Sequence, residues 1–383
     1  MSAALKVVFL FSDGRPSIAH RATLAMAAIL PRHGVDAVAC FLGDGALVGV
    51  SRDDLGIATV LLGNAGGAVT GRQAREAFEP ALRGARAQVV HAVGSDAHVV
   101  AASVAQRVGV PAVWSQYGAA SFGDLVQLRA ALAPSALILA ASSAAAERQR
   151  RVNPRRVPVE ILPPGAKIPD EAPAARRARA RRALGLEADG FVAGWLASAG
   201  PPDTALRAVA SLCHARPHAR ALIIDDPLLP ADPTRLPAIR TLAATLGIGD
   251  RIGVAPGARG IGPSAALDAL DVAFYLPSTV EVVALAPLEC LAAGVAFVAA
   301  DVPPLREYVN PGRDSVLVPA GDHEALAAAL LALADAPEHR ARIAAAGLAH
   351  LREHFRLETL TKRLVKTYRG IAGQASAPQA AAR

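Results

Sequence analysis

The sequence predicts an α/β protein built from two doubly wound, Rossmann-like domains. Three observations predict this fold class. Short apolar runs alternate with helix-like segments along almost the whole chain, as they do in βαβ units with a parallel sheet. The alternation stops in a Pro-, Ala- and Arg-rich segment at residues 169–182 and then starts again. The length of 383 residues also suits two domains.

The first half opens with a βαβ unit. Residues 6–11 (KVVFLF) form a continuous apolar run, which is typical of a strand buried on both faces. The turn SDGRP follows, residues 18–31 fit a helix, and residues 35–42 fit a second strand. Further strands are expected at residues 88–92, 112–114, 136–140 and 159–162, and helices at residues 96–108 and from residue 143 onward.

The second half repeats the same alternation. Strands are expected at residues 191–196, 221–225, 251–254, 272–276, 296–300 and 316–318. Helices are expected at residues 204–215, 236–246, 287–293, 323–334, 337–355 and 357–371. Residues 372–383 (AGQASAPQAAAR) have low complexity, and we expect them to be disordered.

Composition and charge argue against several classes of function. The net charge is +7, but many of the arginines lie in residues 176–182, which we interpret as a solvated helix face. Basic residues do not alternate with aromatic ones as they do in single-strand binders, so no nucleic-acid partner is expected. The three cysteines, Cys40, Cys213 and Cys290, are isolated, which indicates neither a zinc site nor a disulfide framework.

The sequence also gives an expectation for localisation. The amino-terminal stretch MSAALKVVFLFSDG predicts a strand rather than a signal peptide, and no apolar run is long enough to span a bilayer. We therefore expect a soluble, cytoplasmic protein. The basic residues at 148–156 suggest a peripheral contact with an anionic membrane, at the inner face of the cell membrane.

Two glutamates, Glu281 and Glu289, mark the candidate site in the second half. A buried strand is predicted to end at Leu276, and a helix is predicted to start near Ala286 because Pro is tolerated in a first turn. Glu281 then lies on the loop at the carboxyl end of the sheet, and Glu289 lies about one turn into the helix. The backbone N–H groups at residues 284–287, apart from that of the proline, would attract phosphate.

The pair alone has two interpretations. The functional interpretation is a binding site for a diphosphate flanked by two sugars, in which one carboxylate accepts hydrogen bonds from the hydroxyls of each sugar. The alternative is that Glu281 is an exposed loop residue and Glu289 an acid near the helix start, favoured by the helix dipole.

The wider context resembles the donor-binding half of the family 4 retaining glycosyltransferases (glycosyl transferases group 1), which have the GT-B fold. The resemblance extends from Arg251 to Tyr368. Its pieces, in order, are LPS, the two glutamates with seven residues between them, AAGVAFVAADVPPLREYV, PGRDSVLVPAGDHEALAAALLALADAP and HFRLETLTKRLVKTY. The upstream pieces RHGVDAVACF, VVHAVG, VGVPAVWSQYG and ILPPGAKIP match more loosely.

The resemblance implies an architecture and a set of site residues. It implies an acceptor-side domain at residues 1–168 and a nucleotide-sugar domain at residues 169–355, which face each other across a cleft. It also implies a helix at residues 356–371 that crosses back to the first domain. Glu281 would contact the hydroxyls of the donor sugar and Glu289 the ribose. The catalytic candidates are Glu281 and Tyr117. The donor-binding candidates are Glu289, Ala284, Leu285, Ser278, Arg259 and Gly257. The acceptor-side candidates are Gly14, Arg15 and His91.

The site pattern departs from the family in four places. Val283-Ala284-Leu285 stands where the family has Phe-Gly-Leu, and residues 194–203 lack the Arg and Lys that neutralise the donor diphosphate. Arg207 and Arg259 are the candidate substitutes. The Gly-Gly loop reads Asp13-Gly14-Arg15-Pro16. Tyr117 replaces a His, and with an ordinary pKa near 10 it is the weaker base.

These observations leave three hypotheses. The first is a glycosyltransferase that moves a sugar from a nucleoside diphosphate donor to a glycan or lipid-linked acceptor with retention, for polysaccharide or glycolipid synthesis at the cell surface. The resemblance implies no cofactor and no metal, and Asp225-Asp226-Pro227 is only a pair of acids rather than an acidic triplet. The second is a non-catalytic nucleotide-sugar-binding or scaffold subunit. The third is sugar-phosphate or epimerase chemistry on the same fold.

Overall fold

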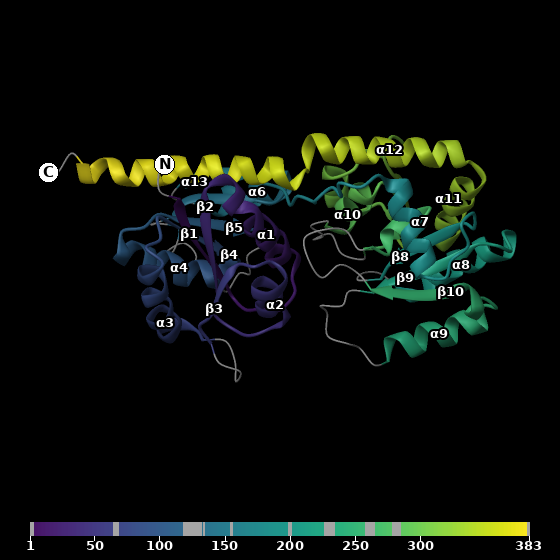
Figure 1. The fold of residues 1–383 in the computed structure, drawn as a ribbon, viewed down its shortest axis with the longest axis horizontal. Helices are drawn as coiled ribbons and strands as arrows, with labels where there is room; N and C mark the ends of the chain where they lie inside the picture. Colours follow the sequence, from purple (N-terminus) through teal and green to yellow (C-terminus); the bar gives the residue numbers. More distant parts are fainter. Residues whose placement is uncertain are drawn as a thin grey trace. The chain divides into compact units, whose positions relative to one another are not determined.

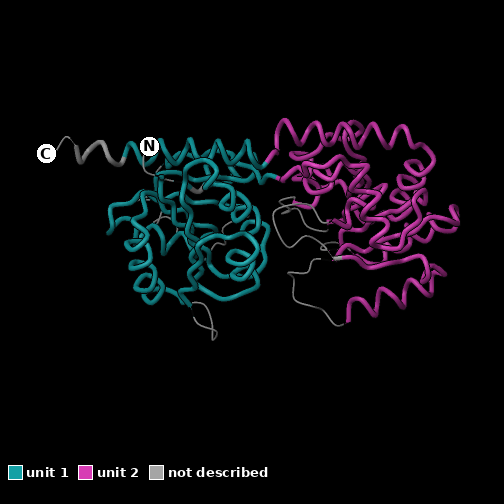
Figure 2. Tube along the Cα trace, in the orientation of Figure 1, with its two compact units in different colours: residues 1–165, 357–383 teal, residues 166–356 magenta. Residues whose placement is uncertain are grey.

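The chain divides into two compact units (Figure 2). The computed structural model describes residues 4–63, 69–117, 132, 135–153, 156–197, 201–225, 234–256, 265–277 and 285–380. Unit 1 comprises residues 1–165 and 357–383, and unit 2 comprises residues 166–356. The sequence placed the first boundary at residue 168, and the two units divide at residue 165.

Unit 1 contains a seven-stranded parallel sheet in the order β3-β2-β1-β4-β5-β6-β7 (Figure 1). The strands are β1 Leu5–Phe11, β2 Val35–Phe41, β3 Ala58–Leu61, β4 Val89–Val93, β5 Ala112–Gln116, β6 Ser135–Ala140 and β7 Val159–Ile161. The chain runs outward in one direction from β1 and in the other direction from β4. The boundary between β1 and β4 is therefore the topological switch point of this sheet.

Helices cover both faces of the unit 1 sheet. They are α1 Ile18–Ile29, α2 Ala46–Gly49, α3 Gly71–Gly84, α4 Ser95–Val108 and α6 Ser143–Val152, with the short helices η1 Leu30–His33 and η2 Val50–Asp54. Val8 and Leu10 of β1 pack with α3 and α4 in one core. Phe9 and Phe11 point to the other face, as alternation along a strand requires, and contact Tyr368 and His20.

Residues 43–87 form elements for which the sequence gave no prediction, namely α2, η2, β3 and α3. Strand β3 has only four residues, pairs with β2 alone within the described sheet, and is mostly exposed. Such an edge strand needs no continuous apolar run, so its sequence carries little strand signal.

Unit 2 contains a six-stranded parallel sheet in the order β10-β9-β8-β11-β12-β13 (Figure 1). The strands are β8 Val192–Leu196, β9 Arg220–Asp225, β10 Ile252–Pro256, β11 Val272–Tyr275, β12 Ala296–Ala300 and β13 Val316–Val318. The helices are α7 Pro173–Ala183, α8 Pro202–Ala215, α9 Arg235–Thr245, α10 Leu285–Ala293, α11 His323–Asp335 and α12 Pro337–His354, with η4 Gly249–Arg251, η5 Leu267–Ala269 and η6 Pro303–Glu307. Its switch point lies between β8 and β11.

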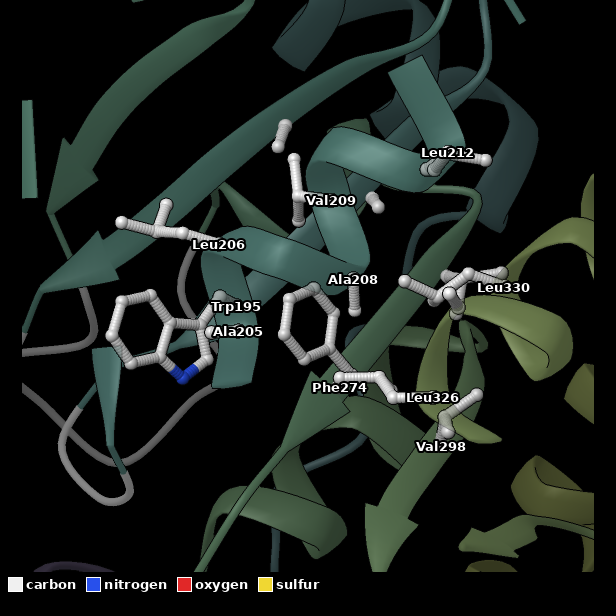
Figure 3. Close-up of a cluster of buried hydrophobic side chains, with 14 of the residues drawn as sticks. Trp195, Ala205, Leu206, Ala208, Val209, Leu212, Phe274, Val298, Leu326 and Leu330 are labelled. Atoms are coloured by element: carbon white, nitrogen blue, oxygen red, sulfur yellow. The ribbon is translucent and has the colours of Figure 1, made fainter. Parts of the chain in front are cut away.

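The core of unit 2 joins the sheet to α8, α9 and α11 (Figure 3). Trp195, Phe274 and Val298 come from the adjacent strands β8, β11 and β12, and they pack against Leu206 and Val209 of α8 and against α11. The alternation of small and large side chains lets two helices approach the sheet without voids. This layer packs against β8 and β11, the two strands that flank the switch point.

Two of the five arginines of α7 are buried, which corrects in part the interpretation of residues 176–182 as a solvated helix face, while Arg179 and Arg182 are exposed as that interpretation expects. Arg176 is only 4% exposed and Arg181 only 2%. Arg176 donates to Asp268 and to the carbonyl oxygen of Ala293. A helix face rich in charge can be buried when each guanidinium finds a carboxylate and carbonyl acceptors, and no helical pattern in the sequence reveals those partners.

Asp271, the residue before β11, is the acceptor around which this cluster forms. Its carboxylate accepts from Arg177 at 2.6 Å and from Arg181 at 2.7 Å, and Arg340 of α12 lies 3.3 Å away. It also accepts from the backbone N–H of Val192, the first residue of β8, at 2.8 Å. One buried carboxylate therefore ties α7 and α12 to the starts of both strands that flank the switch point.

The last helix, α13 Leu357–Ala380, belongs to unit 1, where it contacts α1, η1 and β4. It continues past residue 371, at which the sequence predicted its end, through residues for which disorder was predicted. Alanine has the highest helix propensity, and the low-complexity segment is rich in it. Among the described helices, none is both long enough and apolar enough to cross a membrane.

We expect Asp271→Asn to lower the free energy of unfolding of unit 2 by about 3–5 kcal/mol, because Arg181 would keep a buried charge without its carboxylate. Denaturant-induced unfolding followed by circular dichroism measures this. Asp203→Asn is the matched control, since it breaks an exposed pair with Arg207 that solvent screens, and it should change the free energy of unfolding little. Equal effects of the two substitutions would contradict the assignment.

Candidate functional site

The switch point of unit 2 brings the ends of β8 and β11 together. Trp195 pairs with Phe274, so the two strands end side by side at Leu196 and Tyr275. The connection from β8 leads to α8 and on to β9, and the connection from β11 leads to α10 and on to β12, in the opposite direction along the sheet. Open α/β sheets bind ligands outside the carboxyl ends of their strands at this position.

Helix α10 begins at Leu285, one residue from the start that the sequence predicted. Glu289 is its fifth residue and is half-buried, as is Leu285. Within the described residues, the first turn of α10 contains no acidic residue to offset its positive dipole end, although Pro287 removes one N–H donor. Five of the predicted donor-side and catalytic residues, Glu281, Ala284, Ser278, Arg259 and Gly257, lie outside the described residues.

The start of α8, next to the same switch point, is poorly suited to an anion. Pro201 is its N-cap and Pro202 its first residue, so neither provides an N–H group. Asp203 adds a negative charge in the first turn. Arg207, a predicted substitute cation, is held by Asp203 at 2.8 Å on the exposed surface of the helix. The described part of the β8–α8 connection therefore supplies no uncommitted positive charge.

The loop after β1 carries the predicted residues Gly14 and Arg15. Gly14 packs directly on the loop after β2, because a Cβ atom at Gly14 would lie 2.8 Å from the nitrogen of Gly45. The N–H of Gly14 donates to Gly43 at 2.9 Å. Gly14 is thus required by the close approach of two loops.

Arg15 is exposed and forms an ion pair with Asp13 at 2.7 Å. Burial acts to raise the pKa of Asp13, but the hydrogen bonds from Arg15 outweigh it and hold this pKa below its ordinary value. The carboxylate of Asp13 therefore stays ionised and offsets the charge of Arg15. This makes Arg15 a weak attractor for an anion.

His91 lies in the core of unit 1 and is only 1% exposed. It therefore cannot contact an acceptor substrate, which corrects its prediction as an acceptor-side residue. One ring nitrogen, Nδ1, is hydrogen-bonded to the hydroxyl group of Tyr368 in α13, and Nε2 lies 2.6 Å from Ser115 Oγ of β5. Burial lowers the pKa of His91 to about 3, so its ring is neutral, and burial raises the pKa of Tyr368 well above its ordinary value. A neutral imidazole has one N–H donor and one acceptor nitrogen, so one of the two hydroxyl groups, of Tyr368 or of Ser115, donates to the ring and the other accepts from it.

Tyr368 was missed as a partner of His91, because 277 residues separate the two in sequence. No local pattern marks such a contact. The only signal was an aromatic residue on the apolar face of the last predicted helix, which is an ordinary core position.

Tyr117 directly follows β5 and is partly buried. Burial raises the pKa of its phenol to about 12, against the opposing effect of a hydrogen bond with Thr23 of α1. At neutral pH the hydroxyl of Tyr117 therefore stays protonated and can donate a hydrogen bond but cannot accept a proton. Tyr117 and Tyr368 also interact electrostatically, so the structure brings Tyr117 and His91 into one polar cluster around Tyr368.

Among the described residues, no group of three His, Cys, Asp or Glu side chains is arranged to hold a metal ion. The independence from metal that the resemblance implies stays a prediction.

The sequence and the fold of this chain can now be compared with those of known proteins. Residues 189–350 match the family model of the glycosyl transferases group 1. This group 1 domain covers the sheet of unit 2, α10 and most of α12. Glu289 and the residues of the second switch point thus lie within the matched region.

A relative similar in sequence is a D-inositol 3-phosphate glycosyltransferase from Streptomyces scabiei. It is 34% identical over 218 residues, which are 55% of this chain and 48% of the relative. The chain thus spans about half the length of this curated relative.

Solved structures resemble the whole chain. The structure of Anabaena Alr3699/HepE in complex with UDP has a TM-score of 0.79 and 18% identity, and the match covers 96% of this chain and 100% of that one. The same protein in complex with UDP-glucose has a TM-score of 0.76 at 18% identity, with 96% and 100% covered. A putative UDP-N-acetylglucosamine 2-epimerase from Listeria monocytogenes has a TM-score of 0.63 at 13% identity, with 95% of each chain covered.

At such identities the likeness shows the fold alone. Two parallel sheets with interleaved helices match the GT-B structures, and the predicted α/β fold class with two Rossmann-like domains is confirmed. Because a glycosyltransferase from Rickettsia africae and the putative epimerase both share this fold, the fold does not choose between their reactions.

His91→Gln tests the buried histidine through the pH dependence of stability. The pKa of His91 is about 3 in the folded chain and about 6.5 in an unfolded one. Between these values only the unfolded chain binds the extra proton, so the contribution of His91 is complete above about pH 6.5 and is lost as the pH falls toward 3. We expect the difference in unfolding free energy between wild type and variant to fall by up to about 4–5 kcal/mol over this range.

Denaturant titrations between about pH 4 and 7 measure this difference. Tyr368→Phe is the companion variant. It should lower stability at every pH by about 1–3 kcal/mol, because Nδ1 of His91 loses its hydrogen-bond partner, while the pH dependence is retained. A wild type and a His91→Gln variant with parallel pH profiles would contradict the buried neutral imidazole.

Proposed function

We propose that this chain is a retaining glycosyltransferase that moves a sugar from a nucleoside diphosphate donor to a glycan or lipid-linked acceptor, in polysaccharide or glycolipid synthesis at the cell surface. The observation that carries the proposal is the group 1 domain, whose match includes α10, with Glu289 one turn from an unopposed helix start at the switch point. The names of the curated relative and the UDP complexes of the structural neighbour support a nucleotide-sugar donor.

The proposed roles follow from the chemistry of a diphosphate leaving group. The bond between the anomeric carbon and the terminal phosphate oxygen breaks, and its electron pair stays on the diphosphate. The acceptor oxygen forms the new bond on the same face and gives its proton to the departing phosphate. The start of α10 holds the developing negative charge, Glu289 holds the ribose, Glu281 orients the sugar, and Tyr117 donates a hydrogen bond. No metal ion takes part, so a chelator should leave transfer unchanged.

A second candidate is a nucleotide-sugar-binding or scaffold subunit without turnover. It is favoured by the start of α8, where two prolines and Asp203 stand next to a segment that has no Arg or Lys at residues 194–203. This reading keeps ligand binding and removes catalysis. Epimerase chemistry on the same fold ranks third.

A thermal-shift panel of UDP, GDP, ADP, CDP and dTDP tests the donor site. One nucleoside diphosphate should raise the melting temperature, since a ligand at 100 times its Kd adds about 2.7 kcal/mol of stability. Glu289→Gln should reduce that shift, and Glu324→Gln, which removes an exposed acid in α11, should not. Glu281→Ala tests the predicted contact with the donor sugar in the same way. No shift with any nucleotide would contradict both candidates.

Transfer or hydrolysis of the matching nucleotide-sugar then separates the two candidates. Turnover supports the enzyme, and nucleotide binding without turnover of any donor supports the scaffold.

We further propose a cytoplasmic location with peripheral contact at an anionic membrane, through α6 and the residues after it. Arg148 and Arg151 are exposed on α6, and each basic residue near an anionic surface contributes about 1 kcal/mol. Arg148→Glu with Arg151→Glu should abolish most co-sedimentation with phosphatidylglycerol vesicles. Arg72→Glu with Arg75→Glu on α3 changes the net charge equally and should leave it intact. Equal losses would reduce the effect to net charge and overturn the α6 surface.

A further inference from the structure

Three side chains meet at the switch point of unit 2 on the side of α8 and α9. They are Trp195 in β8, Asp225 at the end of β9, and Arg235, the first residue of α9. The guanidinium carbon of Arg235 lies 6.0 Å from the centre of the Trp195 ring, and its Nη1 lies 4.0 Å from Asp225 Oδ1. We call these three residues the Arg235 cluster.

The charge of Arg235 is only weakly neutralised. Its distance to Asp225 is at the limit of an ion pair, whereas Arg207 lies 2.8 Å from Asp203 and Arg306 lies 2.5 Å from Asp301. The side chain is 29% exposed, and its guanidinium lies over the indole ring at the outer limit of a cation–π contact. An arginine that rests on an aromatic ring keeps the N–H groups at its edge available for a planar or tetrahedral anion.

Trp195 provides a second, independent sign of a missing partner. It is 1% exposed, and its indole N–H has no hydrogen-bond acceptor among the described residues. Figure 3 shows its nitrogen on the side of the ring away from Leu206 and Val209, at the margin of the packed cluster. A buried N–H without an acceptor costs about 1–3 kcal/mol, which an oxygen of a ligand would recover.

The position of the cluster fits an anion that also reaches α10. Trp195 in β8 pairs with Phe274 in β11, the strand that leads to α10. Arg235 of α9 follows β9 and α10 follows β11, so both helices begin at the carboxyl edge of the sheet, where open α/β sheets bind their ligands. The described part of the β8–α8 connection offers no competing cation, because Arg207 is committed to Asp203.

We propose that Arg235 supplies the positive charge that neutralises the diphosphate of the donor, and that Trp195 positions its guanidinium. This inference rests on the proposed function and adds to it the residue that replaces the family's cations. Asp225 keeps the guanidinium near the strand end without consuming its charge. The cation thus comes from the start of α9.

The test compares UDP with uridine, which lacks the phosphates. Arg235→Gln should weaken UDP binding at least tenfold and leave uridine binding unchanged, as measured by isothermal titration calorimetry. Arg240→Gln is the matched control, since it removes an exposed arginine of the same helix and should change neither affinity. Arg235→Lys should recover part of the UDP affinity, because it restores the charge without the planar fork. If the panel selects another base, its diphosphate and nucleoside replace UDP and uridine.

Trp195 is tested as a positioning residue by a double-mutant cycle. Trp195→Phe should weaken UDP binding in the wild type and have little further effect in Arg235→Gln, since two residues that act through one contact are not additive. Fully additive losses would overturn the positioning role.

The outcomes separate this inference from the proposed function. A wild type that binds no nucleoside diphosphate would overturn the proposed function and the inference together. If the wild type and the Arg235→Gln variant bind UDP equally tightly, the inference alone is overturned. Circular dichroism checks that the variant is folded. Loss of uridine binding along with UDP binding would also overturn it, because the effect would then not be on the phosphates.

Discussion

The geometry of the candidate site depends on a buried carboxylate at the opposite end of the sheet. Asp271 accepts from the backbone of Val192 and from Arg177 and Arg181, and so it fixes the starts of β8 and β11 relative to each other. Because strands rise by a constant step per residue, fixing their starts also fixes their ends at Leu196 and Tyr275. Trp195 lies one residue before the end of β8, and α10 is the next helix after β11. The same ion cluster that stabilises unit 2 thus sets the geometry at which a ligand would bind.

Sequence patterns were sufficient where one element carries its own signal. The continuous apolar run at residues 6–11 and the proline near the start of α10 predicted a buried strand and a helix start to within one or two residues. The patterns failed where a residue's environment comes from elsewhere in the chain. Arg176 and Arg181 looked solvated because their acceptors, Asp268 and Asp271, lie about 90 residues away.

The candidate site shows the same division. Glu289 was placed correctly on α10, since its position needs only the strand-turn-helix pattern. His91 was assigned to the acceptor side because it lies in the segment VVHAVG of the resemblance, yet its ring is hydrogen-bonded to Tyr368 from the other end of the chain. No sequence pattern identified Arg235 as a candidate, because its proposed role depends on its contact with the indole ring of Trp195. The hydrophobic period and the motif spacing of a sequence cannot identify residues whose role depends on a tertiary contact.

The charges at the two switch points differ, although the strand order around them is the same. At the β1/β4 switch point, Arg15 is matched by an Asp13 whose pKa is held low, so the loop carries little net charge at neutral pH. At the β8/β11 switch point, Arg235 is loosely paired and the first turn of α10 contains no acid. An anionic ligand gains electrostatic energy at the second point and little at the first. These charges favour the binding of a phosphate-bearing ligand by unit 2, as the proposed function requires, while at unit 1 the protonated Tyr117 can donate a hydrogen bond.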